Sequence, residues 1–521
     1  MKRIIAISIL GIAAVAASAQ TMYDALNYAD VNYYGTARSM ALGNAMTALG
    51  GDLGSIVINP AGSAVAPYSQ FAITPNISIA STTASYSPSY TKSGYTTTLN
   101  DSRARFTLPN MGVSVNFETG RSYGLRSYSF GLLTSSTNLY LERMSARGTQ
   151  EYSSMMGAMA TAADGIHYSY LEDYYSDYGS WLDVLAYKSG MISTANTAGT
   201  AYVGSTEYLD DDGQMGIGGP LYQDYYRQRY GSRNDIVLNF AANFSDRFYI
   251  GANIGIPYLS YAESINQMEE AVDMNDFAME FDDGQTYCFS DALMRYALNV
   301  NGTGIYAKVG AIFLPVDGLR IGAAIQSPTL MTITERYMWD AVCNFDKLRG
   351  SLCETPDGEY TYNLRTPAIL NAGAAYTFGD VALVSVDWER MGFKRMRFSE
   401  YDADYYDSTW DEVNNEIWNY AGTTNSVRVG AEVKVLPQLA LRGGYSFKQY
   451  SGYDYTDTTN AFSFGVGYSS NGSFFADAAI RSTLYPESWY YPYDDYLSVG
   501  SPEVGLKKTV SDIVLTVGWR F

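Results

Sequence analysis

The chain has 521 residues, 48 of them tyrosine and 48 glycine, and a formal net charge of −20. Nucleic-acid binding depends on Lys and Arg side chains that neutralise phosphates, so this acidic balance argues against nucleic acid as a partner. The odd number of cysteines (Cys288, Cys343 and Cys353) argues against a disulfide scaffold, although Cys343 and Cys353 could pair. We expect no metal site and no cofactor.

The N-terminus has the pattern of a secretory signal peptide over residues 1–19. Lys2 and Arg3 precede an apolar stretch, and the small residues Ala17-Ser18-Ala19 precede Gln20, so we expect cleavage after Ala19. The apolar run is shorter than the ~20 residues that a spanning helix needs. No later stretch reaches that length without polar residues, so the mature chain is secreted, periplasmic or a membrane β-barrel.

Residues 20–70 do not alternate between polar and apolar positions. Their side chains are small and weakly apolar, and Met40, Leu42, Met46 and Leu49 have the spacing of a short helix that ends at Gly50-Gly51. A second brief turn ends at Asn59-Pro60. A segment with so little bulk cannot form a large core by itself, but it can fill a space that other walls enclose.

The rest of the chain alternates with the two-residue period of half-buried strands. In the last segment, SDIVLTVGWRF, Ile513, Leu515, Val517 and Trp519 share one face. The same pattern predicts strands at residues 71–88, 103–118, 124–137, 234–244, 247–258, 301–315, 319–335, 359–378, 380–398, 423–436, 438–449, 460–470, 473–483 and 509–521. Alternation alone does not distinguish a water-soluble sandwich from a membrane barrel.

The links between these strands distinguish the two, because they alternate between short and long. The short links include Ser245-Asp246, Val316-Asp317-Gly318 and Asn471-Gly472, which have turn chemistry. The main long links are residues 138–233, 259–300, 336–358, 399–422 and 484–508. Tight turns at one rim and large loops at the other are typical of outer-membrane barrels, whose tight turns are periplasmic.

We therefore predict an all-β fold: a 14-stranded antiparallel transmembrane β-barrel over residues 71–521 in the bacterial outer membrane, with those long links as extracellular loops. Tyrosine suits the aromatic girdles of such a barrel. The acidic residues gather in the long links, as in residues 401–420. They form a solvated surface or hold divalent cations that bridge to lipopolysaccharide; both readings stay open.

The segment ARSMALGNAMTALGGDLGSIVINPAG (residues 37–62), the stretch ALRGGYSF (residues 440–447) and the aromatic-ended last strand resemble the FadL family, also called the TodX type. Its members are outer-membrane transporters of long-chain fatty acids and other hydrophobic compounds. The resemblance extends over the whole chain in strand count and order. It implies that residues 20–70 form a small-residue hatch, or plug, inside the lumen.

Within this hatch the resemblance places Asn59, Pro60 and Ala61 in the family's characteristic turn. An Asn side chain bonds backbone groups locally, and the following Pro biases Asn59 away from helix. Gly62 then permits a close approach to the barrel wall.

Two further features follow from the resemblance. Family members release ligand sideways where the third strand is kinked, and Gly131 is the candidate kink in this chain because an interior glycine bends or weakens a strand. The loop at residues 138–233 departs from the family's usual length, and either forms an external ligand platform or shields the barrel.

Alternation turns several charged side chains toward the lumen, where they either hydrogen-bond the hatch or form ion pairs across the wall. They are Arg428, Glu432, Arg442 and Asp477, together with Asp387 and Arg481. An arginine near the ligand could also receive a fatty-acid carboxylate. We expect no catalytic residue, because the one imidazole, His167, lies in a long loop without a motif around it.

We interpret the chain as a monomeric, non-enzymatic transporter of hydrophobic small molecules such as long-chain fatty acids, acting by passive, hatch-gated diffusion with lateral exit. Its expected partners are that ligand, outer-membrane lipids and lipopolysaccharide, and the outer-membrane barrel assembly machinery. The alternatives are a surface binding or adhesive barrel that acts through its acidic, tyrosine-rich loops, and a general porin.

Overall fold

The computed structural model describes residues 7–8, 21–90, 94–209, 215–281, 283–402, 409–453, 455–470, 473–496 and 500–521. All of the expected signal peptide except Ile7 and Ser8 lies outside these ranges. So do part of the acidic loop at residues 401–420, the acidic run Asp210-Asp211-Asp212, and the turn at Asn471-Gly472.

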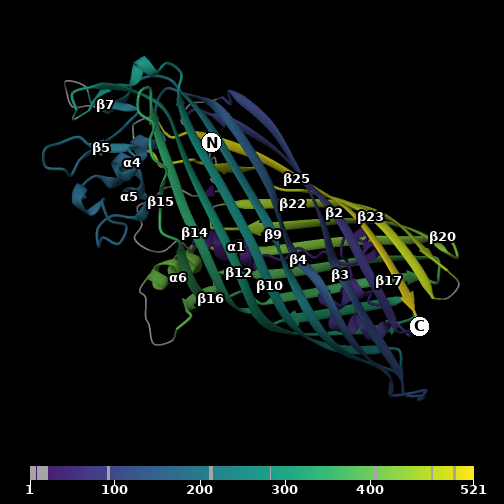
Figure 1. Ribbon diagram of the computed structural model, residues 1–521. Helices are drawn as coiled ribbons and strands as arrows, with labels where there is room; N and C mark the ends of the chain where they lie inside the picture. Colours follow the sequence, from purple (N-terminus) through teal and green to yellow (C-terminus); the bar gives the residue numbers. More distant parts are fainter. Residues whose placement is uncertain are drawn as a thin grey trace.

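The wall is a closed 14-stranded antiparallel barrel, as predicted (Figure 1). Consecutive strands pair around it, and the last strand pairs with the first. Its uninterrupted strands are β2 (Gln70–Ser87), β3 (Thr97–Glu118), β4 (Leu125–Gln150), β9 (Leu221–Phe244), β10 (Phe248–Ala271), β12 (Thr286–Val316), β20 (Thr423–Leu436), β21 (Leu439–Ser451), β22 (Thr456–Ser469), β23 (Phe474–Leu484) and β25 (Glu503–Arg520).

Three wall strands between β12 and β20 are interrupted by a few residues, and each therefore has two parts. They are β13 (Leu319–Gln326) with β14 (Leu330–Phe345), β16 (Gly358–Arg365) with β17 (Ile369–Phe378), and β18 (Ala382–Gly392) with β19 (Arg397–Glu400). Pro328 and Pro367 lie in two of the gaps, where proline cannot donate to a ladder.

An apolar belt surrounds the barrel, because alternation turns one face of every strand away from the lumen. Each wall strand contributes at least one exposed large apolar side chain: Ile77, Phe106, Leu132, Leu238, Ile254, Val309, Ile321, Leu370, Val386, Val429, Leu441, Phe464, Ile480 and Leu515. Water would oppose such a surface and lipid favours it, as expected of a transmembrane barrel. None of the helices in the described ranges is long and apolar enough to cross a membrane.

Several strands extend beyond the belt, so the long loops are shorter than the sequence predicted. β4 and β9 remain paired up to Gln150 and Leu221, which reduces the loop expected at residues 138–233 to residues 151–220. Likewise β10 and β12 occupy most of residues 259–300. The prediction ended these strands too early because their outward positions become polar above the belt, and the apolar alternation fades there.

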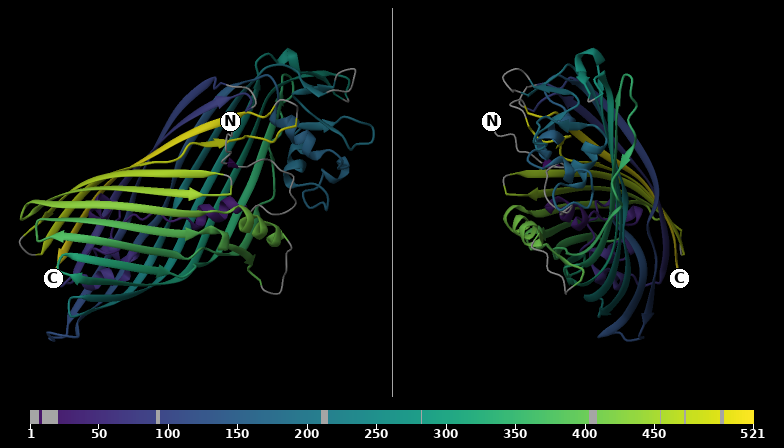
Figure 2. Two further views of the ribbon diagram at one scale, coloured as in Figure 1. Left: turned by 180° about the vertical axis from the view of Figure 1, so that it is seen from behind. Right: turned by 60° about the vertical axis from the view of Figure 1, so that its left-hand side comes forward.

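The described residues of 151–220 form a small domain at the rim opposite the C-terminus (Figures 1 and 2). We call it the extracellular domain, because the prediction places this rim outside the cell. Its core packs on the tips of β10, β12 and β14. Its elements are α4 (Met155–Ala163), η2 (Tyr168–Tyr170), α5 (Trp181–Lys188), β5 (Ile192–Thr194), β6 (Tyr202–Gly204), β7 (Glu207–Leu209) and β8 (Met215–Ile217). The other short elements are β1 (Ile7–Ser8), η3 (Met274–Phe277), β11 (Ala278–Glu280), β15 (Cys353–Glu354), η4 (Phe393–Arg395), α6 (Thr409–Tyr420) and β24 (Ser488–Tyr490).

The N-terminal segment lies inside the barrel as a hatch, as Figures 1 and 2 show in purple. It consists of α1 (Met22–Ala29), α2 (Ala37–Ala41), α3 (Leu53–Ile58) and η1 (Pro60–Val65), and most of its residues are buried. The wall is recessed to receive it by glycines on six strands. A Cβ at any of these positions would lie 2.1 to 2.6 Å from a hatch atom: Gly251, Gly310, Gly322, Gly430, Gly444 and Gly465.

Candidate functional site

Asn59 joins the hatch to the barrel wall. Its Nδ2 donates to the carbonyl oxygen of Thr47 in the hatch at 2.7 Å and to that of Ala311 on β12 at 3.1 Å, while its Oδ1 accepts from the amide of Ala61 at 3.1 Å. Helix α3 ends at Ile58 and η1 begins at Pro60, so Asn59 caps both elements. Within the expected Asn-Pro-Ala turn, the side chain of Asn59 therefore bonds the turn itself, another part of the hatch and the barrel wall.

Gly62 lies in the same turn, but its close approach is not to the wall as predicted. A Cβ there would lie 2.5 Å from Oγ of Ser55 and 3.3 Å from Cα of Gly50, both in the hatch. The sequence could not distinguish these alternatives, because both require only a missing side chain. Gly62 lets η1 pack against α3.

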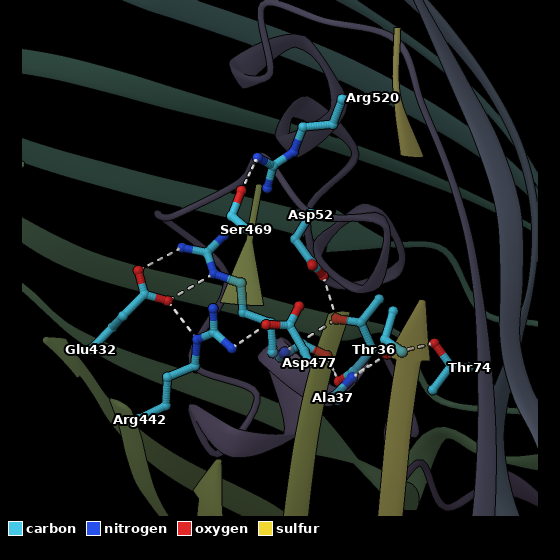
Figure 3. A network of polar contacts seen from close by, with 12 residues as sticks. Thr36, Ala37, Asp52, Thr74, Glu432, Arg442, Ser469, Asp477 and Arg520 are labelled. Carbon is cyan, nitrogen blue, oxygen red and sulfur yellow. Dashed lines mark hydrogen bonds and ion pairs between the residues drawn. The ribbon is translucent and has the colours of Figure 1, made fainter. Parts of the chain in front are cut away.

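An ion network links the hatch to the wall on the opposite side (Figure 3). Glu432 accepts from Arg442 at 2.6 Å and from Arg38 of the hatch at 3.0 Å, and Arg442 also pairs with Asp477 at 2.5 Å. Three of the six predicted lumen residues are thus brought together, and both predicted roles apply to Glu432. Arg38 escaped the prediction because it lies in a segment without strand alternation.

Arg428, another of the six predicted lumen residues, lies apart from that network. Its Nη2 is 3.2 Å from Oε2 of Glu389, and its guanidinium lies over the ring of Tyr33 in the hatch, 5.3 Å from the centroid. Asp387 accepts from the amide and the hydroxyl of Thr47 at 2.7 and 2.6 Å. Arg481 donates to the carbonyl oxygen of Tyr33 at 3.3 Å.

Wall cations that were not predicted also bind hatch carbonyls, and Lys308 and Arg320 are two of them. Lys308 Nζ donates to Val57 at 2.8 Å, and Arg320 Nη1 donates to Leu49 at 2.6 Å. Their signal in the sequence was a charged residue within an apolar strand, although nothing in that signal identifies the partner. With these contacts the hatch is held by opposite sides of the wall.

A cavity of about 340 Å³ lies in the lumen on the extracellular side of the hatch. Its walls come from α1, from Leu139, Tyr140 and Leu141 of β4, and from the tips of β21, β22 and β25. Tyrosine and phenylalanine rings line it, including Phe393, Tyr450, Tyr455 and Tyr485. The lining cations are paired: Lys508 lies 3.2 Å from Glu142, and Lys448 binds Asp30 of the hatch.

Beside this cavity the wall is split between β3 and β4. The two strands pair from Glu118–Ser127 to Asn110–Ser135, and no β3–β4 pair follows in the described residues. Beyond that point β3 pairs with β2 and β4 pairs with β9, so the ladder between β3 and β4 ends there. The split begins near the extracellular edge of the apolar belt, beside Phe106 and Leu108.

The split coincides with a bulge in β4 at Thr137. The register with β9 shifts between Ser136 and Asn138, so Thr137 is the extra residue. Here β4 turns toward the hatch: the amides of Asn32 and Tyr34 donate to the carbonyls of Thr137 and Ser136 at 2.7 and 3.0 Å. A β-bulge bends its strand, and the hatch replaces β3 as its partner.

Gly131 does not mark this interruption. It lies in the regular part of β4, between Ser114 of β3 and Asn239 of β9, and a Cβ there would lie 3.2 Å from Cβ of Asn239. The prediction of a kink at Gly131 is therefore wrong about the position. A bulge needs no glycine, because it arises from the register of two neighbouring strands, and this register is not visible in one strand's sequence.

The extracellular domain contains a buried carboxyl that titrates near neutral pH. Oε2 of Glu207 accepts from the amide of Gly204 at 3.1 Å, and burial raises the pKa of this carboxyl from 4.5 to about 7. Nearby, Glu269 accepts from the hydroxyl of Ser154 and the amide of Met155 at 2.6 and 2.7 Å. These bonds attach the start of α4 to the tip of β10.

The remaining candidates carry no site. His167 lies at the surface of the extracellular domain, where its ring lies against Tyr168 and its Nδ1 bonds Oγ of Ser169. The three cysteines are free thiols, so Cys343 and Cys353 do not pair. Within the part of the chain that the structure describes, no group of three or more His, Cys, Asp or Glu side chains could hold a metal ion.

No model of a known protein family matches the sequence, and no curated protein does. Among solved structures, a Pseudomonas aeruginosa FadL homologue is 14% identical with a TM-score of 0.51, over 94% of this chain and 99% of that one. The P. putida toluene transporter TodX is 13% identical (TM-score 0.48, 94% and 99% covered), and the CymD monoaromatic hydrocarbon channel is 12% identical (0.45, 95% and 98%). The first of these confirms the fold that the resemblance implied.

Proposed function

We propose that this protein is an outer-membrane transporter for hydrophobic small molecules, which enter its cavity from outside and leave sideways through the split between β3 and β4. The transport is passive diffusion, and the hatch closes the direct path along the barrel axis. Long-chain fatty acids and aromatic hydrocarbons are the two ligand classes to test first. The second follows from the name of the structurally similar TodX. We assign no catalytic activity.

The inward turn of β4 at Thr137 is the observation that carries this proposal. The segment that leaves β3 is the same segment that lines the cavity, with Leu139, Tyr140 and Leu141. A ligand in the cavity therefore touches the strand that borders the split. Below the cavity the hatch is bound to opposite walls, which favours a lateral path over an axial one.

The position of the split fits the physical task of such a transporter. A polar lipopolysaccharide leaflet is a poor solvent for a hydrophobic molecule, so a route that ends in the apolar layer of the membrane avoids the polar part. The split begins beside Phe106 and Leu108, whose side chains belong to the belt. The walls of the cavity, lined by tyrosine rings and a few paired charges, suit an apolar or amphiphilic ligand.

Deleting Thr137 tests the lateral route. Because Ser136 pairs with Asn234 and Asn138 with Arg233, the deletion restores a regular β4–β9 ladder without moving any other pair. We expect β4 to straighten toward β3 and the uptake of labelled oleate or toluene to fall to the level of cells without the protein. Uptake by cells that express equal surface amounts of each variant is the measurement.

Deleting Arg126 is the matched control. Arg126 is the extra residue of a second bulge on β4, which lies between Leu125 and Ser127 at the rim with the tight turns. That variant should retain uptake. If removal of Thr137 leaves the uptake of both ligands intact, the lateral route is wrong. If neither ligand is taken up by the unaltered protein, the choice of ligand class is wrong.

A further inference from the structure

Beyond the split, the free end of β3 lies over the outer face of β4 and β9. Residues 97–109 of β3 point Ala104, Phe106 and Leu108 away from the barrel, and Arg103 and Arg105 toward it. Arg105 Nη1 donates to the carbonyl oxygen of Gly231 on β9 at 2.5 Å. The guanidinium of Arg103 lies over the ring of Tyr230, 5.3 Å from its centroid.

Two more arginines, on the outward face of β4, lie next to Arg103 and Arg105. Arg143 lies over the ring of Tyr226, 5.6 Å from its centroid, and its Nε is 3.5 Å from Oδ1 of Asp101 on β3. Arg147 donates through Nε to Asp224 of β9 at 3.0 Å. We call Arg103, Arg105, Arg143 and Arg147 the arginine seam.

Two of the four arginines of the seam lack a carboxylate partner in the described residues. Among the described residues neither Arg103 nor Arg105 has a carboxylate within 4.0 Å, and Nη1 of Arg103 is buried without an acceptor. Arg143 has one distant partner. Uncompensated arginines are unexpected on a protein with a net charge of −20. They indicate an anion that binds from outside the chain.

The height of the seam identifies the environment of that anion. Arg105 directly precedes Phe106 of the belt in the sequence. At this level the outward residues of β2 change from Ile77 and Ile79, which pair with Phe106 and Ala104, to Ser81, which pairs with Ser102. Tyr222, Tyr226 and Tyr230 follow one another on the outward face of β9. This is the level at which lipid headgroups meet a barrel and amphipathic rings are favoured.

We propose that the arginine seam binds the phosphate groups of a phosphorylated glycolipid of the outer leaflet. Guanidinium groups bind phosphate bidentately and stay charged, and the stacked tyrosines hold two of them in place. A transported ligand does not reach them, because the cations that line the cavity are Arg229, Lys448 and Lys508. The bound lipid seals the upper part of the split and leaves the part beside the belt open.

Binding of bis-phosphorylated lipid A to the full-length protein in detergent tests this proposal, with native mass spectrometry as the readout. We expect R103Q/R105Q to weaken the binding of lipid A at least tenfold. The same acylated disaccharide without phosphates should bind the unaltered protein as weakly as lipid A binds the variant. R103K/R105K, which keeps the charges and loses the bidentate geometry, should lie in between.

The matched control is R126Q, an exposed arginine at the opposite rim that pairs with Asp246, and it should bind lipid A as the unaltered protein does. Resistance of the folded barrel to SDS at room temperature shows that each variant has folded. Equal affinity for the phosphate-free lipid, or no effect of R103Q/R105Q, would overturn the proposal. So would preferential binding of oleate that depends on Arg103 and Arg105, since this would assign the seam to the transported ligand.

Discussion

At the scale of single residues, the hatch is held by buried polar side chains that each make several bonds at once. Asn59 is the clearest case, because it is fully buried and bonds both the hatch and β12. A buried polar group that loses its partner costs about 1 to 3 kcal/mol. Local changes at such residues should therefore loosen the hatch while the wall remains intact.

Asn59→Ala should make the barrel leak. The change leaves the carbonyls of Thr47 and Ala311 without this donor and the amide of Ala61 without its acceptor, which destabilises the closed hatch by about 1 to 3 kcal/mol. We expect brief open events and a higher mean conductance in planar bilayers. Asn363→Ala is the control, since Asn363 bonds Thr332 and Glu400 within the wall. Equal conductance of the two variants would contradict the role of Asn59.

Glu207 should make the extracellular domain less stable as the pH rises. Since the pKa of its carboxyl is about 7 in the folded domain against an ordinary 4.5, the folded state holds the proton more tightly. The stabilisation is complete below about pH 4.5, is lost as the pH rises through 7, and then levels off. Proteolysis within residues 151–220 should thus be faster at pH 8 than at pH 5.

Glu207→Gln should flatten this dependence of the proteolysis rate on pH, because an amide does not titrate. Glu172→Gln changes an exposed carboxyl in the same domain and should keep the slope of the unaltered protein. A slope that survives in Glu207→Gln would show that another group is responsible.

At the scale of elements, strand alternation places side chains, and the exceptions to it have functions. The bulge at Thr137 moves β4 from β3 to the hatch and makes the split. Glycines at inward positions of six strands make room for hatch segments that would otherwise collide with the wall. The missing side chains of these glycines therefore matter to the fit of the hatch as much as the side chains that contact it.

Two neighbouring glycines of β21 test this idea directly. A Cβ on Gly444 would lie 2.2 Å from the amide nitrogen of Gly43 in the hatch, whereas a Cβ on Gly443 would meet no atom nearer than 4.0 Å. Gly444→Ala should displace α2 and raise conductance in planar bilayers, and Gly443→Ala should leave conductance unchanged. Both variants should fold to SDS-resistant barrels. An unchanged conductance of the Gly444→Ala variant would mean that the hatch accommodates the added methyl group without losing stability.

At the scale of the whole molecule, the wall and the hatch have separate roles. Every wall strand has an apolar outer face and continues the sheet, whereas the hatch contributes polar contacts across the lumen. The belt thus does not depend on the hatch. The extracellular domain adds a third part, with its own core on the tips of three strands.

Deletion of residues 21–66 distinguishes the proposed transporter from a porin or an adhesive barrel. We expect a large constant conductance and the loss of selective oleate or toluene uptake, because the lumen then loses its closure and one wall of the cavity. A porin would conduct substantially before the deletion. An adhesive barrel would keep its surface binding after it. Single-channel recordings and uptake assays on the same preparations provide the comparison.

The sequence by itself determined the strand count, the order of the strands, the rim that bears the long loops and the segment that forms the hatch. These features are local, because polar–apolar alternation, turn residues and small side chains can each be recognised in a few consecutive residues. The tertiary structure alone decided that Arg38 pairs with Glu432, that Arg428 pairs with Glu389, and that the wall splits at Thr137 rather than at Gly131. Such pairs depend on the register between strands and on how the hatch lies in the lumen, and both are set only when the barrel closes around it.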